Sequence, residues 1–343
     1  MQITQLLDLA LEKNASDVHV GTGSVPALRI GGNVVKLEQP PVPEAEIISF
    51  LEKYSSTPIQ WQNTREMDLA ISYRTVRLRV HAFRTYQGWA LAIRLLSGQI
   101  PTLQHLNLPP IFKKITTARQ GLVIITGPTG SGKSTTLAAM IEEINRTRPV
   151  NIITIEDPIE YVYEPKMALI QQREVQTHTD SFARALRAAL REDPDVILVG
   201  EMRDLETIRA ALEAAETGHL VLSTLHTNSA AETIDRIIQV FPDYQQQQIR
   251  MMLADALLAV VAQRLVPASV PLGRVAVQEI LVVNTAVRNL IRENKTFQIP
   301  SIIQTGSGLG MQTFQQHLQR IRQQGIVSME FNTEAVLGLM QGV

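Results

Sequence analysis

The sequence predicts an α/β protein of two domains, in which the C-terminal domain is built on a parallel sheet. After residue 110, short apolar runs alternate with helical patterns, a rhythm that is typical of βαβ units. Between residues 68 and 93, apolar residues instead recur at every second position, which indicates antiparallel strands. A chain of 343 residues is also long enough to hold two hydrophobic cores.

Residues 1–98 are expected to form the smaller, mixed α/β domain. Its expected elements are an amphipathic helix at the start of the chain, strands at residues 16–20, 27–30 and 34–38, a helix after the prolines of residues 40–43, and an antiparallel meander from Asp68 onward. The meander places one face on a core.

Arginines occupy the other face of this meander. Arg77 and Arg79 project together from one strand, and Arg94 lies toward the end of the next long strand. A solvated sheet face explains such charged alternation. The alternative is that one or more of these arginines reaches a phosphate of a neighbouring subunit as an arginine finger. The residues alone leave both interpretations open.

A proline-containing linker, residues 99–110, is expected to join this domain to the larger one at residues 111–343. Strands of the larger domain are expected within residues 122–126, 151–161, 195–204, 219–227 and 274–283. Helices are expected to fill the gaps, among them a long one that runs from Asp243 up to residues 264–267. From about residue 284 the pattern predicts a helical C-terminal subdomain with helices at residues 285–294, 311–325 and 331–340.

The segment at residues 122–140, LVIITGPTGSGKSTTLAAM, predicts a site for nucleotide phosphates. A buried strand, a G-x-x-x-x-G-K-[ST] loop and an amphipathic helix follow one another there, which is the context that this motif requires. Glycines let main-chain N–H groups turn toward phosphate oxygens, Lys133 can reach the β and γ phosphates, and Ser134 can hold Mg²⁺. The predicted binding residues are Gly127, Pro128, Thr129, Gly130, Ser131, Gly132, Lys133, Ser134 and Thr135, and the expected ligands are ATP and Mg²⁺.

Carboxylates follow two of the expected strands and are predicted to lie near these phosphates. Glu156, Asp157 and Glu160 follow one strand, and Glu201 follows another, with Gly200 at the position where such strands usually carry a first acid. Glu160 is expected to orient or deprotonate the attacking water, and Glu201 to serve the outer coordination sphere of Mg²⁺. The alternative for each is a helix-capping or surface carboxylate.

His226 ends a third strand, with Thr224 and Thr227 beside it. A histidine at this edge can sense the γ-phosphate by hydrogen bonding, although a single histidine is more often structural. His219 is a second candidate sensor or a turn residue. The other histidines have no ligand spacing, so no metal site beyond Mg²⁺ is predicted.

Composition excludes several functional classes. Lys and Arg number 32 against 33 for Asp and Glu, and aromatic residues make up 5%, which leaves little for binding nucleic acid. The chain has no cysteine, so disulfides, thiol catalysis and Cys-ligated zinc are excluded. The first residues carry charges inside a helical pattern, which does not fit a signal peptide, and no transmembrane stretch is expected. We therefore expect a cytoplasmic protein.

Several segments together closely resemble the PilT family, the retraction ATPases of type IV pili within the secretion ATPase superfamily. The resemblance rests on the phosphate loop and on ITIEDPIEYV, QQREV, ALREDPDVILVGEMRDLETIRAALEAAETGHLVLSTLHT, AVRNLIRE and LGMQTF. It spans nearly the whole chain. The phosphate loop alone occurs in many unrelated enzymes, whereas the boxes around Glu160 and Glu201 are far more specific, and AVRNLIRE is typical of the retraction branch.

The resemblance implies a homohexamer in which a PAS-like N-terminal domain packs on the RecA-like domain of the next subunit. It implies that Glu160 is the catalytic glutamate and that Glu201 is the Walker B glutamate, with Gly200 as the family's usual replacement. His219 to His226 would form the histidine box. Among the arginines that reach nucleotide, Arg79 and Arg94 fit best. Residues 286–293 would be needed for retraction without binding ATP.

The function implied is an ATP-driven motor that disassembles pili and powers twitching motility. It would act in the cytoplasm, peripheral to the inner membrane through a pilus platform protein and, in some systems, with a paralogous retraction ATPase. An auxiliary retraction ATPase of the PilU type, or an assembly ATPase of the same superfamily, is the nearest alternative. A RecA-like nucleic-acid translocase and a nucleotide-gated scaffold without turnover are alternatives of other classes.

Overall fold

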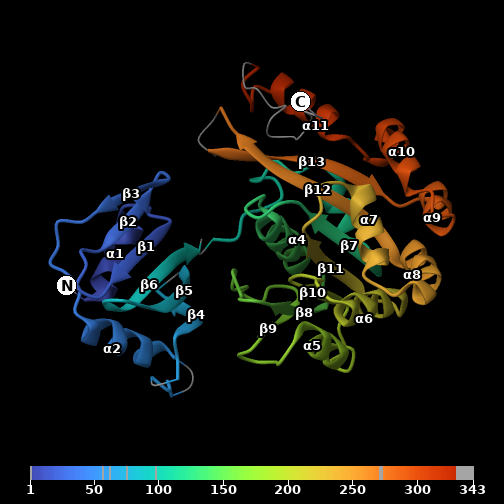
Figure 1. The fold of residues 1–343 in the computed structure, drawn as a ribbon. Coiled ribbons are helices and arrows are strands. Elements are labelled where there is room, and N and C mark those ends of the chain that lie inside the picture. The colour runs from blue at the N-terminus through green and yellow to red at the C-terminus, as the bar shows by residue number, and fades with distance from the viewer. Residues whose placement is uncertain are drawn as a thin grey trace. The chain divides into compact units, whose positions relative to one another are not determined.

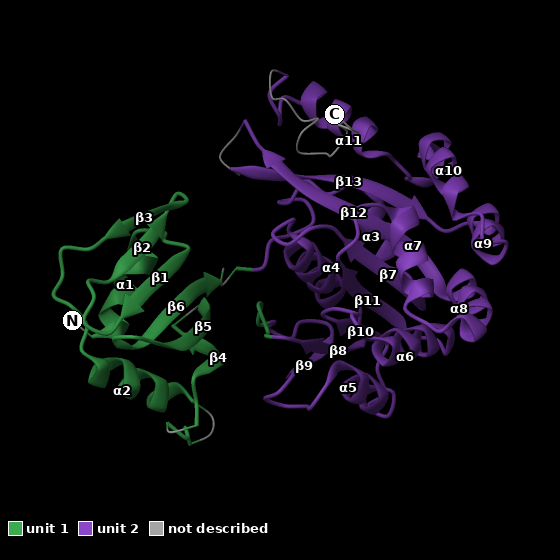
Figure 2. Cartoon of the chain, viewed as in Figure 1, with its two compact units in different colours: residues 1–99, 158–162 green, residues 100–157, 163–343 purple. Residues whose placement is uncertain are grey.

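The computed structural model describes residues 2–55, 58–61, 63–74, 76–96, 99–269 and 273–329. The chain divides into two compact units, Met1–Gln99 with Pro158–Val162, and Ile100–Asp157 with Tyr163–Val343 (Figure 2). The sequence analysis had assigned residues 158–162 to the larger domain, whereas in the structure they group with the smaller unit. The predicted helix at residues 331–340 lies outside the described residues.

The first unit is a six-stranded antiparallel sheet in the order β3-β2-β1-β6-β5-β4. Its elements are α1 (Ile3–Glu12), β1 (Asp17–Gly21), β2 (Ala27–Ile30), β3 (Asn33–Lys36), α2 (Glu44–Tyr54), β4 (Glu66–Tyr73), β5 (Val76–Thr85) and β6 (Gly88–Leu96). The apolar faces of both helices share one core with the sheet, because alternate strand residues such as Leu78 and Val80 are buried there. Arg79 lies between them on the other face and is exposed.

The second unit is a seven-stranded sheet in the order β13-β12-β7-β11-β10-β8-β9 (Figure 1). Its strands are β7 (Gly121–Thr126), β8 (Asn151–Glu156), β9 (Leu169–Glu174), β10 (Val196–Val199), β11 (Leu220–Leu225), β12 (Leu257–Pro267) and β13 (Arg274–Val282). Neighbouring strands pair in parallel except for the antiparallel pair of β12 and β13. The predicted α/β fold with a mostly parallel sheet is therefore confirmed.

Helices of the second unit fill the connections between these strands. They are α3 (Ile111–Ile115), α4 (Lys133–Thr147), α5 (Phe182–Ala189), α6 (Leu205–Glu216), α7 (Ala230–Gln239), α8 (Asp243–Ala256), α9 (Thr285–Arg292), α10 (Ile299–Thr305) and α11 (Phe314–Gln323), with 3₁₀ turns η1 (Thr296–Gln298) and η2 (Ser307–Leu309). Side chains of Ser181, Asp204 and Ser229 accept hydrogen bonds from the first turns of α5, α6 and α7, which fixes where these helices begin. Within the described ranges, no helix combines the length and the apolar character needed to cross a membrane.

The predicted long helix after Asp243 was partly wrong. α8 ends at Ala256, and the following eleven residues form strand β12. β12 pairs with β7 on one side and β13 on the other, and most of its residues are buried on both faces. A strand of this kind and a buried helix both appear as continuous apolar runs, and periodicity does not separate them. The edge strand β9 was not predicted, because its sequence LIQQRE is largely polar.

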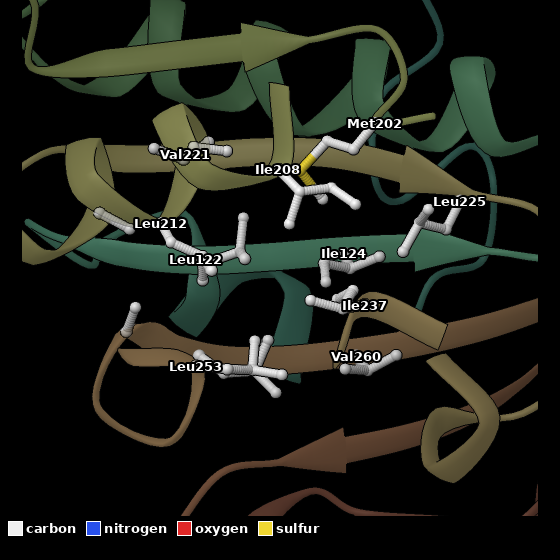
Figure 3. Close-up of a cluster of buried hydrophobic side chains, with 14 of the residues drawn as sticks. Leu122, Ile124, Met202, Ile208, Leu212, Val221, Leu225, Ile237, Leu253 and Val260 are labelled. Carbon is white, nitrogen blue, oxygen red and sulfur yellow. The ribbon is translucent and has the colours of Figure 1, made fainter. Parts of the chain in front are cut away.

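All six residues of β7 are buried, which fixes the strand that precedes the phosphate loop. Leu122 and Ile124 point into the largest core of the unit, together with Ile208, Ile237 and Val260 from α6, α7 and β12 (Figure 3). Burial of one such side chain stabilises a fold by roughly 1.5–3 kcal/mol. The end of β7, where the loop begins, is therefore held by packing on both faces.

Candidate active site

Three glycines give the phosphate loop its shape. The loop connects the end of β7 to Lys133, the first residue of α4, and Gly127, Gly130 and Gly132 have φ angles of 145°, 78° and 85°. Such positive angles are readily adopted only by glycine. A Cβ atom at Gly127 would also lie 2.2 Å from the main-chain oxygen of Gln263, so this position has no room for a side chain.

Lys133 is held inside the loop that it follows. Its Nζ donates hydrogen bonds to the main-chain oxygens of Gly127 and Pro128, at 2.8 and 3.1 Å, and the residue is only 8% exposed. The N-terminal N–H groups of α4 have no partners within the helix and carry its positive dipole end. A buried ammonium group beside a helix N-terminus and a glycine loop fits an anion of high charge, such as a chain of phosphates.

The other predicted binding residues line the same loop. Pro128, Thr129, Gly130 and Ser134 are exposed, whereas Ser131 is buried. Ser134 offers a hydroxyl oxygen, and Glu201 of the same unit offers a carboxylate, so the predicted Mg²⁺ ligands are all oxygen atoms, as that ion prefers. Within the described ranges, no three His, Cys, Asp or Glu side chains gather in a way that could bind a metal by themselves.

Threonines tie the loop to the end of β11. The hydroxyl groups of Thr126 and Thr227 lie 2.7 Å apart, and the Thr227 main-chain N–H donates to Thr126 Oγ1 at 2.8 Å. Thr227 Oγ1 in turn lies 2.6 Å from Thr233 Oγ1 on α7. Since His226 immediately precedes Thr227, these buried hydrogen bonds fix the histidine next to the loop.

His226 and Glu201 lie close together at the ends of β11 and β10. Their Nε2 and Oε2 atoms are 3.8 Å apart, and Glu201 Oε2 also forms an ion pair with Nε of Arg203 at 2.7 Å. Burial and the nearby positive charge of Lys133 lower the pKa of His226. The imidazole is therefore neutral at physiological pH. A cavity of about 310 Å³ begins at these two residues and extends between Arg236 and apolar side chains of α6 and α7.

Gly200 leaves Glu201 as the acid at the end of β10. The Gly200 N–H donates to the Ile155 main-chain oxygen at 2.8 Å, so the chain passes close to β8 here. A Cβ atom at this position would lie 3.3 Å from that oxygen and 3.4 Å from Cα of Glu156. An aspartate would force β8 and β10 apart by a few tenths of an ångström.

The three carboxylates at and just after the end of β8 have different surroundings. Glu156 is nearly buried and accepts hydrogen bonds from Thr154 Oγ1 at 2.6 Å and Gln172 Nε2 at 3.2 Å, so it stabilises the strand end. Asp157 is exposed. Glu160 is half-buried in the segment that groups with the first unit. Its predicted role toward water remains a prediction.

Arg79 and Arg94 lie opposite each other across the β5–β6 ladder, and both are exposed. Arg94 Nε donates to Asp17 Oδ1 at 3.0 Å. Burial would raise the pKa of Asp17, but hydrogen bonds from Ser16 and Arg94 outweigh it, and the pKa is lowered. The side chain of Arg79 has no hydrogen-bond or ion-pair partner within the described ranges. Asp17 therefore offsets the charge of Arg94, whereas Arg79 presents an exposed positive charge opposite it.

The structure thus brings the loop, Glu201 and His226 together in the second unit, and Glu160, Arg79 and Arg94 belong to the first. Sequence reasoning missed one residue that contacts the loop, Gln263. It is 1% exposed on β12, and its Nε2 donates to the Ser131 main-chain oxygen at 2.7 Å. A single amide inside an apolar strand was the signal, but the assignment of this run to a helix concealed it.

Comparison with known proteins agrees with this site. The family model described as "Type II/IV secretion system protein" matches residues 1–272. The type IV pilus retraction ATPase PilT of Pseudomonas aeruginosa is 45% identical over 333 residues, which is 96% of both chains. A twitching motility protein of Neisseria gonorrhoeae is 50% identical over 308 residues, which cover 89% of this chain and 82% of that one.

A solved structure of similar fold is the crystal structure of the pilus retraction motor PilT with bound ADP. It superimposes with a TM-score of 0.88 at 45% sequence identity and covers 96% of this chain and 95% of that chain. The similarity therefore includes both compact units and the loop.

Proposed function

This chain belongs to the family of type II/IV secretion system proteins, and we propose that within this family it is an ATPase that powers the retraction of type IV pili. The observation that carries the proposal is the glycine loop with buried Lys133, in a chain that matches a pilus retraction ATPase along 96% of its length. The ADP in the similar PilT structure supports nucleotide binding by this loop.

Lys133 and the main-chain N–H groups of the loop bind the phosphates of ATP in this proposal. Transfer of the γ-phosphoryl group to water needs positioning and charge compensation more than covalent catalysis. Lys133 supplies one positive charge, and its burial among carbonyl oxygens keeps it directed into the loop. Ser134 would hold Mg²⁺ directly and Glu201 would serve its outer coordination sphere, and the ion would supply further charge compensation.

His226 senses the γ-phosphate by hydrogen bonding. Its lowered pKa keeps the imidazole neutral, so one ring nitrogen can donate to a phosphate oxygen while the other can accept. The threonine contacts behind it transmit a shift of the loop to α7, because Thr227 is bonded both to Thr126 and to Thr233.

Glu160 orients the attacking water, and arginines from the first unit of a neighbouring copy compensate charge in the transition state. Arg79 and Arg94 are suited to this role, since they form an exposed pair of like charges. Arginines supplied by a second subunit are worth about 10³–10⁵ in rate in other nucleotide hydrolases. A site to which two subunits contribute residues requires an oligomer, and we propose that this oligomer is a homohexamer.

The ring acts on a pilus platform protein at the cytoplasmic face of the inner membrane and does not bind nucleic acid. ATP hydrolysis moves the two units of each subunit against each other, and this movement removes pilins from the base of the fibre. A paralogue of the PilU type is a further partner, and PilU of Pseudomonas aeruginosa is itself 40% identical to this chain over 333 residues.

The proposal is tested by expression of the chain in cells that lack their own retraction ATPase. The wild-type chain is expected to restore twitching and to reduce the excess of surface pili, whereas Lys133→Ala should restore neither. Western blotting shows whether both proteins accumulate equally. Cells that keep excess pili with the wild-type chain, despite ATP hydrolysis by the purified protein, would exclude a retraction role and favour an auxiliary or assembly ATPase.

A further inference from the structure

Four polar residues form a continuous hydrogen-bond network through the core of the second unit. Gln263 on β12, Gln278 on β13, Gln312 and His317 are between 0 and 6% exposed. Isolated polar side chains are rare in such surroundings unless their hydrogen bonds are satisfied. Their contacts run from the phosphate loop to α11, which lies against β13 (Figure 1).

Gln263 contacts the loop and the helix that follows it. Its Nε2 donates to the main-chain oxygen of Ser131 at 2.7 Å, and its Oε1 accepts from Thr136 Oγ1 at 2.9 Å. A Cβ atom at Gly132 would lie 3.0 Å from the same Nε2 atom. The amide group therefore sets the path of the loop on the side that faces β12.

Gln278 stands opposite Gln263 in the β12–β13 ladder and orients it. Gln278 Nε2 donates to Gln263 Oε1 at 2.8 Å. That oxygen accepts two hydrogen bonds while Nε2 donates to Ser131, so an exchange of the two atoms would place the amide oxygen against the Ser131 oxygen and an N–H against the Gln278 N–H. The orientation of the Gln263 amide depends on Gln278.

α11 and the residues before it hold Gln278 in turn. β13 is the edge strand of the sheet, and at Gln278 its main-chain groups point outward. The Gln278 N–H donates to His317 Nδ1 at 3.0 Å, and its main-chain oxygen accepts from Gln312 Nε2 at 3.1 Å. Arg320 of α11 then donates to Gln312 Oε1 at 2.7 Å.

The hydrogen-bond network of these four residues is not optimised for stability. Oε1 of Gln278 has no hydrogen-bond partner within the described part of the chain, although it is buried. A buried network with an unsatisfied member is less stable than apolar side chains of the same volume. Two glutamines at these positions therefore indicate a role in positioning.

We propose that Gln263 is a positioning residue for the phosphate loop, and that His317 of α11 controls the nucleotide affinity of that loop through Gln278. We call the four residues the loop relay. The inference rests on nucleotide binding by the loop, as proposed above. It makes α11 a point at which the C-terminal part of the chain regulates the active site.

The test compares His317→Leu with His317→Asn and measures ADP binding by calorimetry. Leucine removes the acceptor for the Gln278 N–H, whereas Oδ1 of asparagine occupies the position of Nδ1 and restores it. His317→Leu and Gln263→Leu are expected to weaken ADP binding about tenfold, and His317→Asn to stay within about twofold of wild type. Hydrogen exchange of residues 128–134 without nucleotide should become faster in both leucine variants.

Val277→Ala is the matched control, because Val277 is a fully buried neighbour of Gln278 on the same strand and takes no part in the relay. It should lower the melting temperature as much as the leucine variants do while leaving ADP affinity and loop exchange unchanged. Wild-type affinity and exchange in Gln263→Leu and His317→Leu would overturn the proposal. If the wild-type protein bound no ADP, the proposed function would fail, and unchanged loop exchange would overturn the relay independently.

Discussion

Gly127, Lys133 and Gln263 show how single residues define the phosphate loop. Gly127 has no space for a side chain against Gln263, and Gln263 in turn bonds the loop at Ser131. Lys133 is satisfied by two carbonyl oxygens of the loop itself. The contacts of Gln263 and Lys133 therefore fix the loop, and its exposed side remains available for phosphates.

His317 gives a prediction for the dependence of stability on pH. Burial, followed by the charge of Arg320, lowers the pKa of His317 to about 4. Between that value and the ordinary pKa of about 6.5, the unfolded chain binds more protons than the folded one. Stability is therefore full above about pH 6.5 and falls toward pH 4, by roughly 3 kcal/mol for this group.

His317→Asn removes the titrating group and keeps the hydrogen bond to Gln278. Its free energy of unfolding, measured in urea from pH 7 to pH 4, should fall less steeply than that of the wild type. Equal slopes for the two proteins would show that His317 is not buried in its neutral form.

The contact between β7 and β11 shows how whole elements position the site. Thr126 is the last residue of β7, and Thr227 follows the end of β11, so their bond sets the distance between the loop and His226. The same pair connects to α7 through Thr233. A change at the loop can thereby reach α7 through Thr233.

Thr126→Val tests this coupling, since valine has the same shape and lacks the hydroxyl. The Thr227 N–H loses its acceptor, which costs about 1–3 kcal/mol, and we expect kcat for ATP to fall about tenfold. Ser223→Ala removes a comparable buried hydroxyl bond, to the Val199 oxygen, elsewhere in the same sheet. It should lower stability without lowering kcat. An equal loss of kcat in both variants would show that the threonine contact contributes to stability alone.

The elements that a short sequence motif identifies could be predicted from the sequence. The glycine motif between a strand and a helix located the loop, and the residues after β10 and β11 located Glu201 and His226. β12 was assigned to a helix because a strand buried on both faces has no period-two pattern. Gln263 was missed for the same reason, and its contact with Ser131 spans 132 positions of the chain.

Membership of the family confirms the predicted fold and ATPase class of the whole molecule, whereas the roles of the single site residues remain predictions.

The unit to which residues 158–162 belong is where the division of the whole molecule differs from the prediction. They follow β8 of the large sheet, yet they group with the first unit, where the Ile159 main-chain oxygen accepts from Arg77 Nε at 3.5 Å. Membership of this unit depends on three-dimensional packing, and no local pattern in EDPIEY marks it.

The most direct measurement of the central claim is the rate of ATP hydrolysis by the purified Glu160→Gln variant. We expect a loss of at least about 100-fold in kcat with ADP affinity unchanged, because the amide cannot accept a proton from water. Glu164→Gln, the same substitution four residues further at an exposed position, should hydrolyse ATP at the wild-type rate. Hydrolysis by Glu160→Gln at the wild-type rate would contradict the account.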